Sequence, residues 1–285
     1  MIARGQGNAM ADTITFTDFS ASHLEAATAL SQAERWPHQV EDWRLSLSLS
    51  RGIAAMAGDQ LAGTTLVTPF GDVAMLNMII VASGQRGRGL GRELMQRAMA
   101  LASPREWRLV ATDDGLPLYR KLGFVETGHI VQHQGHLADE PGGEGADRAA
   151  AQDAAEIARL DRAATGMERT SLVAALLRVG EVAVLREGSR ITAYAARRPF
   201  GRGDVIGPVV AADADAARRL IAAQLAGRKG LFTRVDIPAD SGLAPWLAGF
   251  ALPEVGSGIA MRLGPPAPAA AGGARSFALA SQALG

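Results

Sequence analysis

The residues with the clearest chemical potential form a glycine-rich segment, Arg86-Gly87-Arg88-Gly89-Leu90-Gly91, between an apolar run and a run of helical periodicity. Glycines allow backbone N–H groups to point into one cavity and a ligand to approach without meeting a Cβ atom. A helix starting there adds the positive end of its dipole, which favours a bound anion. Arg86, Arg88 and Arg92 would each be unfavourable there by roughly 0.3–1 kcal/mol without a compensating anion. The pattern predicts a phosphate-binding loop, with a plain glycine turn and solvated arginines as the alternative.

Two common phosphate motifs do not match this loop. A Walker loop needs Gly-Lys-Ser/Thr, whereas the chain reads Leu90-Gly91-Arg92. The dinucleotide fingerprint needs G-x-G-x-x-G, whereas the spacing here is G-x-G-x-G. The ligand is therefore expected to be a different phosphate carrier.

A second motif lies downstream, where TDDGLPLYRKLGF ends in an aromatic-x-x-x-Gly-Phe pattern formed by Tyr119, Gly123 and Phe124. Together the two motifs resemble the GNAT superfamily of N-acetyltransferases, and the resemblance covers residues 12–132. The chain as a whole is similar to a bacterial tandem-GNAT subgroup with a degenerate C-terminal GNAT-like domain. This resemblance implies two tandem GNAT-like acyl-CoA N-acyltransferase domains.

The first motif meets the GNAT loop signature, Q/R-x-x-G-x-G/A, through Arg86, Gly89 and Gly91. The resemblance implies acetyl-CoA as cosubstrate. No metal is expected, because no cluster of His and carboxylate residues has metal-ligand spacing. The resemblance also implies that the backbone of the strand before the loop binds the cofactor and that an N–H there stabilises an oxyanion. The expected cofactor-binding residues are Ile79, Ile80, Val81, Arg86, Gly87, Arg88, Gly89, Leu90, Gly91 and Arg92.

Tyr119 is the catalytic residue that the resemblance implies, as general acid to the leaving thiolate. A phenol of pKa ~10 that donates to a thiolate of pKa ~8.5 goes uphill by ~2 kcal/mol. Hydrogen bonding to the thiolate is therefore expected to matter as much as full proton transfer. The alternative is a packed tyrosine on a short helix.

The acceptor amine poses a second requirement, because an amine of pKa ~10.4 is only about 0.04% neutral at pH 7. Many GNAT enzymes use a glutamate on a central strand as the base, and this chain has none there. His38, Asp42, Asp113 and Asp114 are candidates, although each is also typical of a surface or capping residue.

Trp36, His38, Trp43 and Asn77 are the candidate substrate contacts. The first three fall in the broken helical region that lines the acceptor site in the GNAT fold, and Asn77 lies on the central strand. Trp36, which precedes a proline, is equally typical of a packed helix corner.

The chain also contains an internal repeat. Pro69-Phe70-Gly71 recurs as Pro199-Phe200-Gly201, 130 residues later, and the same offset aligns Gly58 with Gly188. A repeat this long is a whole domain. We therefore predict a catalytic domain at 10–137, a Gly-rich and charged linker at 138–150, and a degenerate domain at 151–285.

Periodicity predicts an α/β fold, a mixed α+β sheet with helices on both sides. In the first half the expected elements are a broken helical region 20–50, strands 52–57 and 60–68, a strand 73–81, a helix 90–102, a strand 107–112, a helix 116–122 and a strand 125–132.

The second half lacks the loop. Asp213 and Asp215 stand near the start of the equivalent helix, where they would repel pyrophosphate, and Pro245 replaces the tyrosine. This half is expected not to bind coenzyme A and instead to complete the acceptor pocket or form the surface of a homodimer. His129, His133 and His136 are interpreted as solvated, with metal binding as the minor alternative.

Composition narrows the function further. The 285 residues contain no cysteine, which excludes thiol catalysis, and carry 29 basic and 29 acidic side chains. No nucleic-acid or membrane partner is expected, and the protein is expected in the cytoplasm. The prediction is an N-acetyltransferase that moves acetyl from acetyl-CoA to a primary amine of a small molecule by direct attack in a ternary complex. The alternatives are a protein or peptide N-acetyltransferase and a non-catalytic acyl-CoA sensor.

Overall fold

The computed structural model describes residues 13–142, 145–267 and 273–285. The predicted domain start at residue 10 lies outside these ranges, as do parts of the predicted linker. The first half consists of β1 Ile14–Asp18, η1 Ala21–His23, α1 Leu24–Ala33, α2 Val40–Ser48, β2 Arg51–Ala57, β3 Gln60–Phe70, β4 Val73–Val81, η2 Ser83–Gln85, α3 Leu90–Met99, β5 Glu106–Ala111, α4 Leu116–Lys121 and β6 Val125–His136.

The second half repeats the order of α-helices and strands up to β12 and adds β13. It consists of β7 Asp147–Arg148, η3 Ala151–Asp153, α5 Ala154–Thr165, α6 Thr170–Val179, β8 Glu181–Glu187, β9 Arg190–Phe200, β10 Gly203–Ala211, α7 Ala214–Leu225, β11 Phe232–Pro238, α8 Ala244–Ala248, β12 Glu254–Leu263 and β13 Arg275–Ala278. The expected mixed α/β fold is confirmed. The elements expected in the first half are present with shifted ends; β1 was not expected, and the last strand continues to His136.

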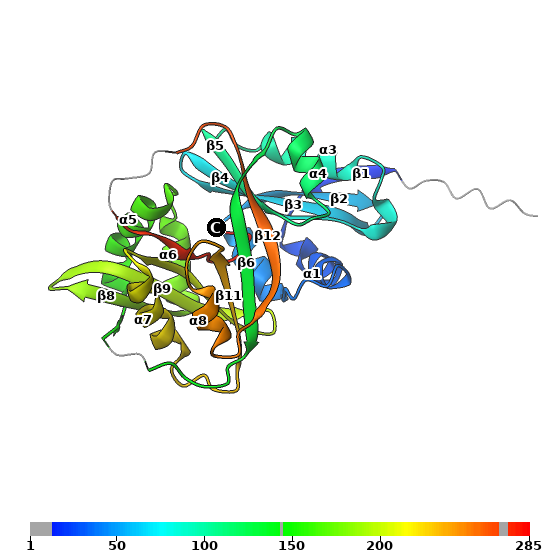
Figure 1. Cartoon of the computed structure of the whole chain (residues 1–285). Helices are drawn as coiled ribbons and strands as arrows, with labels where there is room; N and C mark the ends of the chain where they lie inside the picture. Colours follow the sequence, from blue (N-terminus) through cyan, green and yellow to red (C-terminus); the bar gives the residue numbers. More distant parts are fainter. Residues whose placement is uncertain (1–12, 143–144, 268–272) are drawn as a thin grey trace, which may run out of the picture.

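One continuous sheet runs through both halves in the order β1-β2-β3-β4-β5-β12-β6-β11-β10-β9-β8-β7. The two halves exchange strands at its centre. β12, from the second half, pairs antiparallel with β5, and β6, from the first half, pairs antiparallel with β11. β6 and β12 also pair with each other and run side by side across the molecule (Figure 1). The domain boundary at 137–138 remains a prediction, and the two halves share one sheet across it.

Helices cover both faces of each half of the sheet (Figure 1). In the first half α3 packs on β2 to β4, and α1 and α2 pack on the other face around Trp43 and Leu66. In the second half α7 packs on β8 to β10, and α5 and α6 lie opposite. One apolar cluster joins Phe70 and Met75 of the first half to Leu172 of the second, so part of the core belongs to both halves.

A buried charged cluster lies in the second half. Arg169 and Asp161 form a fully buried ion pair, with Nε of Arg169 donating to Oδ2 of Asp161 at 2.8 Å, and the Tyr194 hydroxyl also donates to Asp161. Although burial opposes the charge, the neighbouring carboxylate raises the pKa of Arg169 above its ordinary value. Arg169 Nη1 also donates to the backbone oxygens of Leu284 and Gly285. The cluster therefore holds the last residues of the chain against α5 and α6.

Asp161→Asn is expected to lower the free energy of unfolding by about 3–5 kcal/mol, because it leaves the buried Arg169 charge without its partner. Urea unfolding measures this. Glu187→Gln is the matched control, since it breaks an exposed pair with Arg190 and should change stability by about 1 kcal/mol or less. Equal effects of the two substitutions would contradict the role of Asp161 as the stabilising partner of the buried Arg169 charge.

Candidate active site

The site begins where β4 and β5 separate. The two strands pair in parallel only between Val73–Met75 and Glu106–Arg108. Beyond this point β4 carries a bulge, with Met78 and Ile79 facing the single residue Thr65 on β3. Met78 adopts a positive φ of 49°, and its carbonyl accepts a hydrogen bond of 2.7 Å from Thr64 Oγ1. The bulge turns the backbone at Ile79 out of the regular β3–β4 ladder.

The glycine loop follows and forms one wall of a cavity of about 620 Å³. Gly87 and Gly89 have φ values of 76° and 81°, with open space where a Cβ would lie. The predicted cofactor residues that line this cavity are Ile79, Ile80, Val81, Arg86, Gly87, Gly89, Leu90, Gly91 and Arg92. Arg88 does not line it and instead donates to Gln85. We call this space the cofactor cavity.

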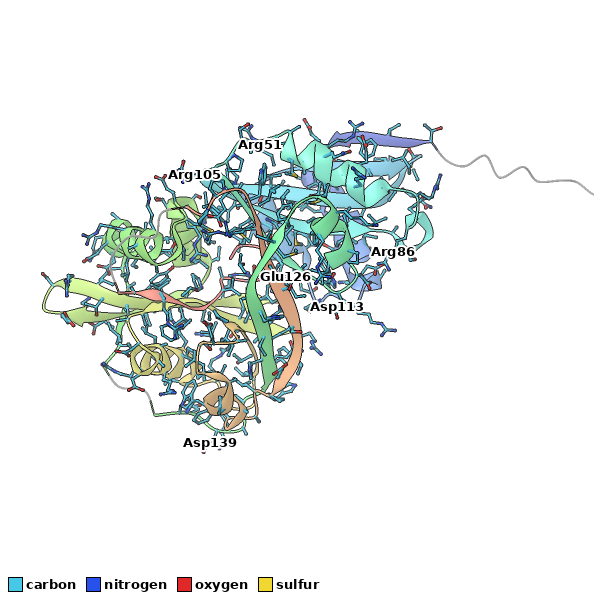
Figure 2. All side chains as sticks on the ribbon, turned by 45° about the horizontal axis from the view of Figure 1, so that its top comes forward. Arg51, Arg86, Arg105, Asp113, Glu126 and Asp139 are labelled. Atoms are coloured by element: carbon cyan, nitrogen blue, oxygen red, sulfur yellow. The ribbon has the colours of Figure 1, made fainter. Side chains whose placement is uncertain are left out.

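The arginines of the loop differ in their partners. Arg86 donates through Nη2 to Glu34 at the end of α1 and through Nε to the Val81 carbonyl at 3.2 Å, and its Nη1 lies 3.9 Å from Asp114. Figure 2 shows Arg86 and Asp113 on the same side of the first half. Arg92 has no acidic partner within the described ranges. Arg86 thus joins the end of α1 to the end of β4, and Arg92 retains an uncompensated charge beside the loop.

Tyr119 lies between the loop and the strand edge. Its ring packs against Phe124 and over Gly115, where an added Cβ would come within 2.7 Å of the ring and 3.1 Å of the hydroxyl. Burial raises the pKa of the Tyr119 phenol above its ordinary value. The hydroxyl makes no hydrogen bond to another described residue. Tyr119 is therefore a protonated donor that is open to a ligand.

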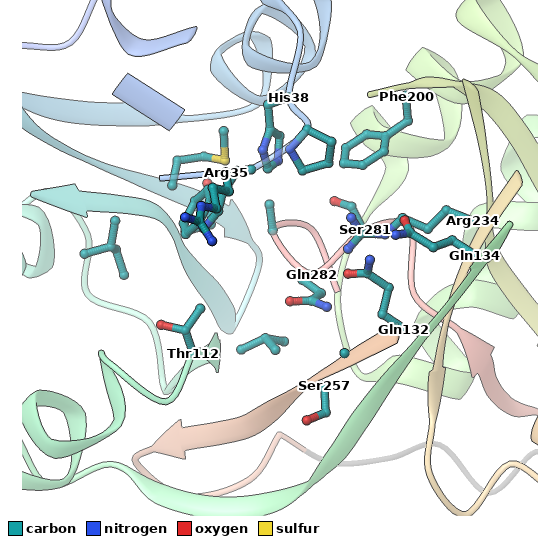
Figure 3. Close-up of a pocket in the computed structure, with 18 of the residues that line it drawn as sticks. Arg35, His38, Thr112, Gln132, Gln134, Phe200, Arg234, Ser257, Ser281 and Gln282 are labelled. Atoms are coloured by element: carbon teal, nitrogen blue, oxygen red, sulfur yellow. The ribbon is translucent and has the colours of Figure 1, made fainter. Parts of the chain in front are cut away.

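A second cavity, of about 470 Å³, adjoins the first; we call it the acceptor cavity. Trp36, Ile79, Thr112 and Tyr119 line both cavities. The other walls come from both halves, including Phe200 on β9, Arg234 on β11 and residues 281–283 near the chain end. Figure 3 shows these elements converging on one space. The two cavities therefore meet beside the bulge and Tyr119.

Three of the predicted acceptor contacts, Trp36, His38 and Asn77, line this cavity. Asn77 is buried; its Nδ2 donates to Thr68 Oγ1 at 2.8 Å, and its Oδ1 has no partner. Trp43 is a correction to the prediction. It is fully buried in the core, stacks on Phe19 and donates to Ser31, so its apolar ring stabilises the helix packing and does not reach the acceptor cavity.

His38 contacts the Phe200 ring edge-on across the junction of the two halves. Burial, with the nearby Arg234 and Arg198 cations, lowers the pKa of His38 to about 3, so the imidazole is neutral at pH 7. Its Nδ1 is buried without a hydrogen-bond partner. Such a low pKa makes His38 a poor acceptor for an ammonium proton.

The other three candidate bases do not face the acceptor. Asp42 is buried and accepts hydrogen bonds from Gln39, Arg198 and Gly201, which ties α2 to β9. Asp114 lines the cofactor cavity only, and Asp113 lines neither cavity. No carboxylate of the described chain lines the acceptor cavity.

The sequence led us to expect that the second half completes the acceptor pocket, and residues of this half do line the acceptor cavity, but sequence reasoning named none of them and missed β6. Gln132 and Gln134 alternate on β6 and face the cavity, because side chains two apart on a strand share a face. Between them, His133 points the other way and is buried against the Leu252 carbonyl at 2.8 Å, so its predicted solvation is wrong. The repeated Pro-Phe-Gly motif was the available signal for Phe200, whereas nothing in the sequence places Arg234 here.

The second half repeats the bulge but not the open space. Gly207 and Pro208 face Ala196 as Met78 and Ile79 face Thr65. Pro208 has no N–H to donate. β10 and β11 also pair only briefly and then separate, and β13 enters the gap, pairing with β10 while Leu279 N donates to the Asp236 carbonyl of β11 at 2.9 Å. Asp213 caps α7 by accepting from Ala216 N at 2.8 Å.

Family models give the class of this protein. Two models, each described as an acetyltransferase (GNAT) domain, match residues 49–126 and 157–273. The chain is an acetyltransferase, a class that transfers an acyl group from acyl-CoA. It belongs to the GNAT acetyltransferases and carries two GNAT domains in tandem.

Individual proteins agree with this assignment. The uncharacterised N-acetyltransferase YitH of Bacillus subtilis is 26% identical over 228 residues, which cover 76% of this chain and 80% of YitH. A putative acetyltransferase from Pyrococcus horikoshii has a similar fold, with a TM-score of 0.80 at 20% identity over 95% of this chain and 96% of that one. A tandem GNAT protein from the clavulanic acid biosynthesis pathway has a TM-score of 0.60 at 15% identity, over 89% of this chain and 100% of that one.

GNAT acetyltransferases use acetyl-CoA as cosubstrate, and the residues of the cofactor cavity fit it. The open glycine loop and Arg92 suit a pyrophosphate, and the β4 bulge offers backbone groups beside Tyr119. No three His, Asp or Glu side chains in the described ranges are grouped to hold a metal ion. No helix within those ranges is long and apolar enough to cross a membrane.

The full-length protein is expected to bind one acetyl-CoA per chain in a calorimetric titration. Gly89→Val should weaken binding about tenfold or more, because a β-branched residue is strained at a positive φ by about 1–3 kcal/mol and its side chain enters the open space at the loop. Gly58→Val is the control: it has a φ of 58° and open space, but lies in the β2–β3 turn away from both cavities. Two cofactors per chain, or equal weakening by both variants, would refute the assignment.

Tyr119→Phe is expected to lower kcat about 100-fold or more while cofactor affinity stays unchanged, because only the donor is lost. Gly115→Ala should also lower kcat, since its Cβ displaces the tyrosine ring. The raised pKa keeps Tyr119 protonated, so the wild type should lose no rate through its ionisation below about pH 10. Steady-state kinetics across pH measures this, and a fully active Tyr119→Phe would exclude the role.

Proposed function

We propose that this protein transfers the acetyl group of acetyl-CoA to a primary amine of a small molecule by direct attack in a ternary complex. The observation that carries the proposal is the meeting of the two cavities at Ile79, Thr112 and Tyr119. Both substrates can be bound at once, which places an amine beside a thioester without a covalent enzyme intermediate.

In the proposed reaction the amine nitrogen forms a bond to the acetyl carbonyl carbon and the C–S bond breaks. Acetyl-CoA supplies the activated acetyl group. The backbone N–H of Ile79, a residue that the β4 bulge takes out of the β3–β4 register, donates to the developing oxyanion in this proposal. The Tyr119 hydroxyl stabilises the departing thiolate. The amine proton passes to water, since no carboxylate lines the acceptor cavity among the described residues.

The one-sided charge of the acceptor cavity also affects the protonation of the acceptor amine. Arg35, Arg202 and Arg234 line the acceptor cavity. Positive charge near an ammonium group lowers its pKa, which raises the fraction of neutral, nucleophilic amine. The positive charge of the cavity thus favours the neutral amine, which is the form that a general base would otherwise produce.

The size of the acceptor cavity favours a small molecule over a peptide. Its volume is about 470 Å³, and β6, β11, β12 and the last residues of the chain contribute to its lining. This is in the range of small-molecule sites of roughly 300–1,000 Å³. A cytoplasmic location and the absence of nucleic-acid and membrane partners belong to the same proposal and rest on the sequence.

The test is release of free coenzyme A thiol from acetyl-CoA with a panel of small amines and N-terminal peptides. Turnover with small amines at rates well above the peptides is expected. Faster acetylation of peptides would favour the protein N-acetyltransferase alternative. Cofactor binding in calorimetry without turnover of any amine would favour an acyl-CoA sensor.

A further inference from the structure

The charge of the acceptor cavity is one-sided. Arg35, Arg202 and Arg234 line it, whereas no aspartate or glutamate among the described residues does. Arg35 and Arg202 are exposed and have no acidic partner in the described part of the chain. Two unpaired cations at the edge of a cavity raise the local concentration of an anionic ligand.

Arg234 is the buried cation of this wall. Its Nε donates to both Asp236 oxygens at 3.0 Å, and its Nη2 lies 2.9 Å from Oδ2. Nη1 makes no hydrogen bond with the described residues, and the guanidinium lies 5.1 Å from the Phe200 ring centroid. Asp236 therefore holds the guanidinium in place while one edge of it stays available to a ligand.

Uncharged donors surround this guanidinium. Gln132 and Gln134 reach the cavity from β6, and Ser281 and Gln282 reach it from the segment after β13. None of these four side chains has a hydrogen-bond partner among the described residues. Figure 3 shows them with Arg234 along one wall, across the cavity from Arg35 and Thr112. Three amides and one hydroxyl without partners in a cavity wall are positioned for a polar ligand.

We propose that the acceptor amine carries an anionic group, a carboxylate or a phosphate, which binds at this wall to Arg234 Nη1 and the neighbouring amides. The proposal rests on the proposed acetyl transfer and names its substrate class. The anion lies at the wall of Arg234, and the amine extends to the junction with the cofactor cavity at Tyr119. Polyamines and other polycations are excluded as good substrates, because several positive charges would have to enter a cavity that already carries positive charge.

The experiment uses matched pairs of amines that differ in the anion alone. One arm compares amino acids that have small, aliphatic, aromatic and hydroxyl side chains with their carboxamides. The other arm compares an aminohexose phosphate with the unphosphorylated aminohexose. Thiol release gives kcat and KM, and calorimetry on the full chain saturated with coenzyme A gives the affinity of each amine.

At least one anionic amine is expected to bind about tenfold or more tightly than its neutral match, and the arm in which this happens distinguishes carboxylate from phosphate. The inference is overturned if no anionic amine binds more tightly than its match. Binding with this preference but no turnover would leave the anion site intact and reject the proposed acetyl transfer. Turnover that favours neutral or polycationic amines would support the proposed acetyl transfer and reject the anion site.

Variants locate the effect. Arg234→Gln combined with Asp236→Asn removes both charges of the buried pair together, so neither remains unpaired. It should raise KM for the anionic amine about 10- to 100-fold, and by a much larger factor than KM for the neutral match. Arg202→Gln tests the exposed cation without disturbing the buried pair and should raise the same KM by a smaller factor.

Arg51→Gln is the control for surface charge, because Arg51 is exposed and lines neither cavity (Figure 2). It should change neither KM. A rise in KM of similar size for both members of a matched pair in the double variant would show a general loss of structure and would contradict the anion site. Equal effects of Arg51→Gln and Arg202→Gln would contradict it as well.

Discussion

The exchange of strands at the centre of the sheet is the constraint on which the site depends. β12 pairs with β5, and β6 pairs with β11, so the last long strand of each half completes the sheet of the other. The register of these pairings determines which residues of the two halves stand side by side, and it sets Arg234 of β11 opposite Gln134 of β6. The exchange fixes Arg234 and Gln134 opposite the edge of β4, and for this reason the acceptor cavity exists only when both halves are folded together.

The two halves carry the same bulge and the same separation of strands, yet they differ in what enters the gap. In the first half it remains open beside Gly87 and Gly89 and forms the cofactor cavity. In the second, β13 fills it, and the Leu279 carbonyl lies where a Cβ on Gly207 would be, 1.8 Å away. The chain itself therefore occupies the second gap and continues from it into the acceptor cavity.

The electrostatics of the site differ from those of an active site that relies on a carboxylate as general base. The acceptor cavity has arginines and amides but no carboxylate in its described lining. Tyr119, whose phenol pKa is raised by burial, is a donor throughout the neutral range. In the proposed reaction, the acceptor amine loses its proton more easily in such surroundings, and donors at the thioester matter more than a base.

The sequence determined what depends on neighbouring residues: the loop before α3, the Tyr119 motif, the strand β4 and the repeat itself, because turns, helix starts and strand periodicity are local properties. It also indicated the missing loop in the second half through Asp213. It misplaced Trp43 and His133, since helical and strand patterns do not say which neighbour a face will meet. Only the tertiary structure decided the exchange of β6 and β12, the filling of the second gap and the joining of Arg234 to Tyr119 in one site. These arise from pairings between segments more than 100 residues apart, which local propensity does not encode.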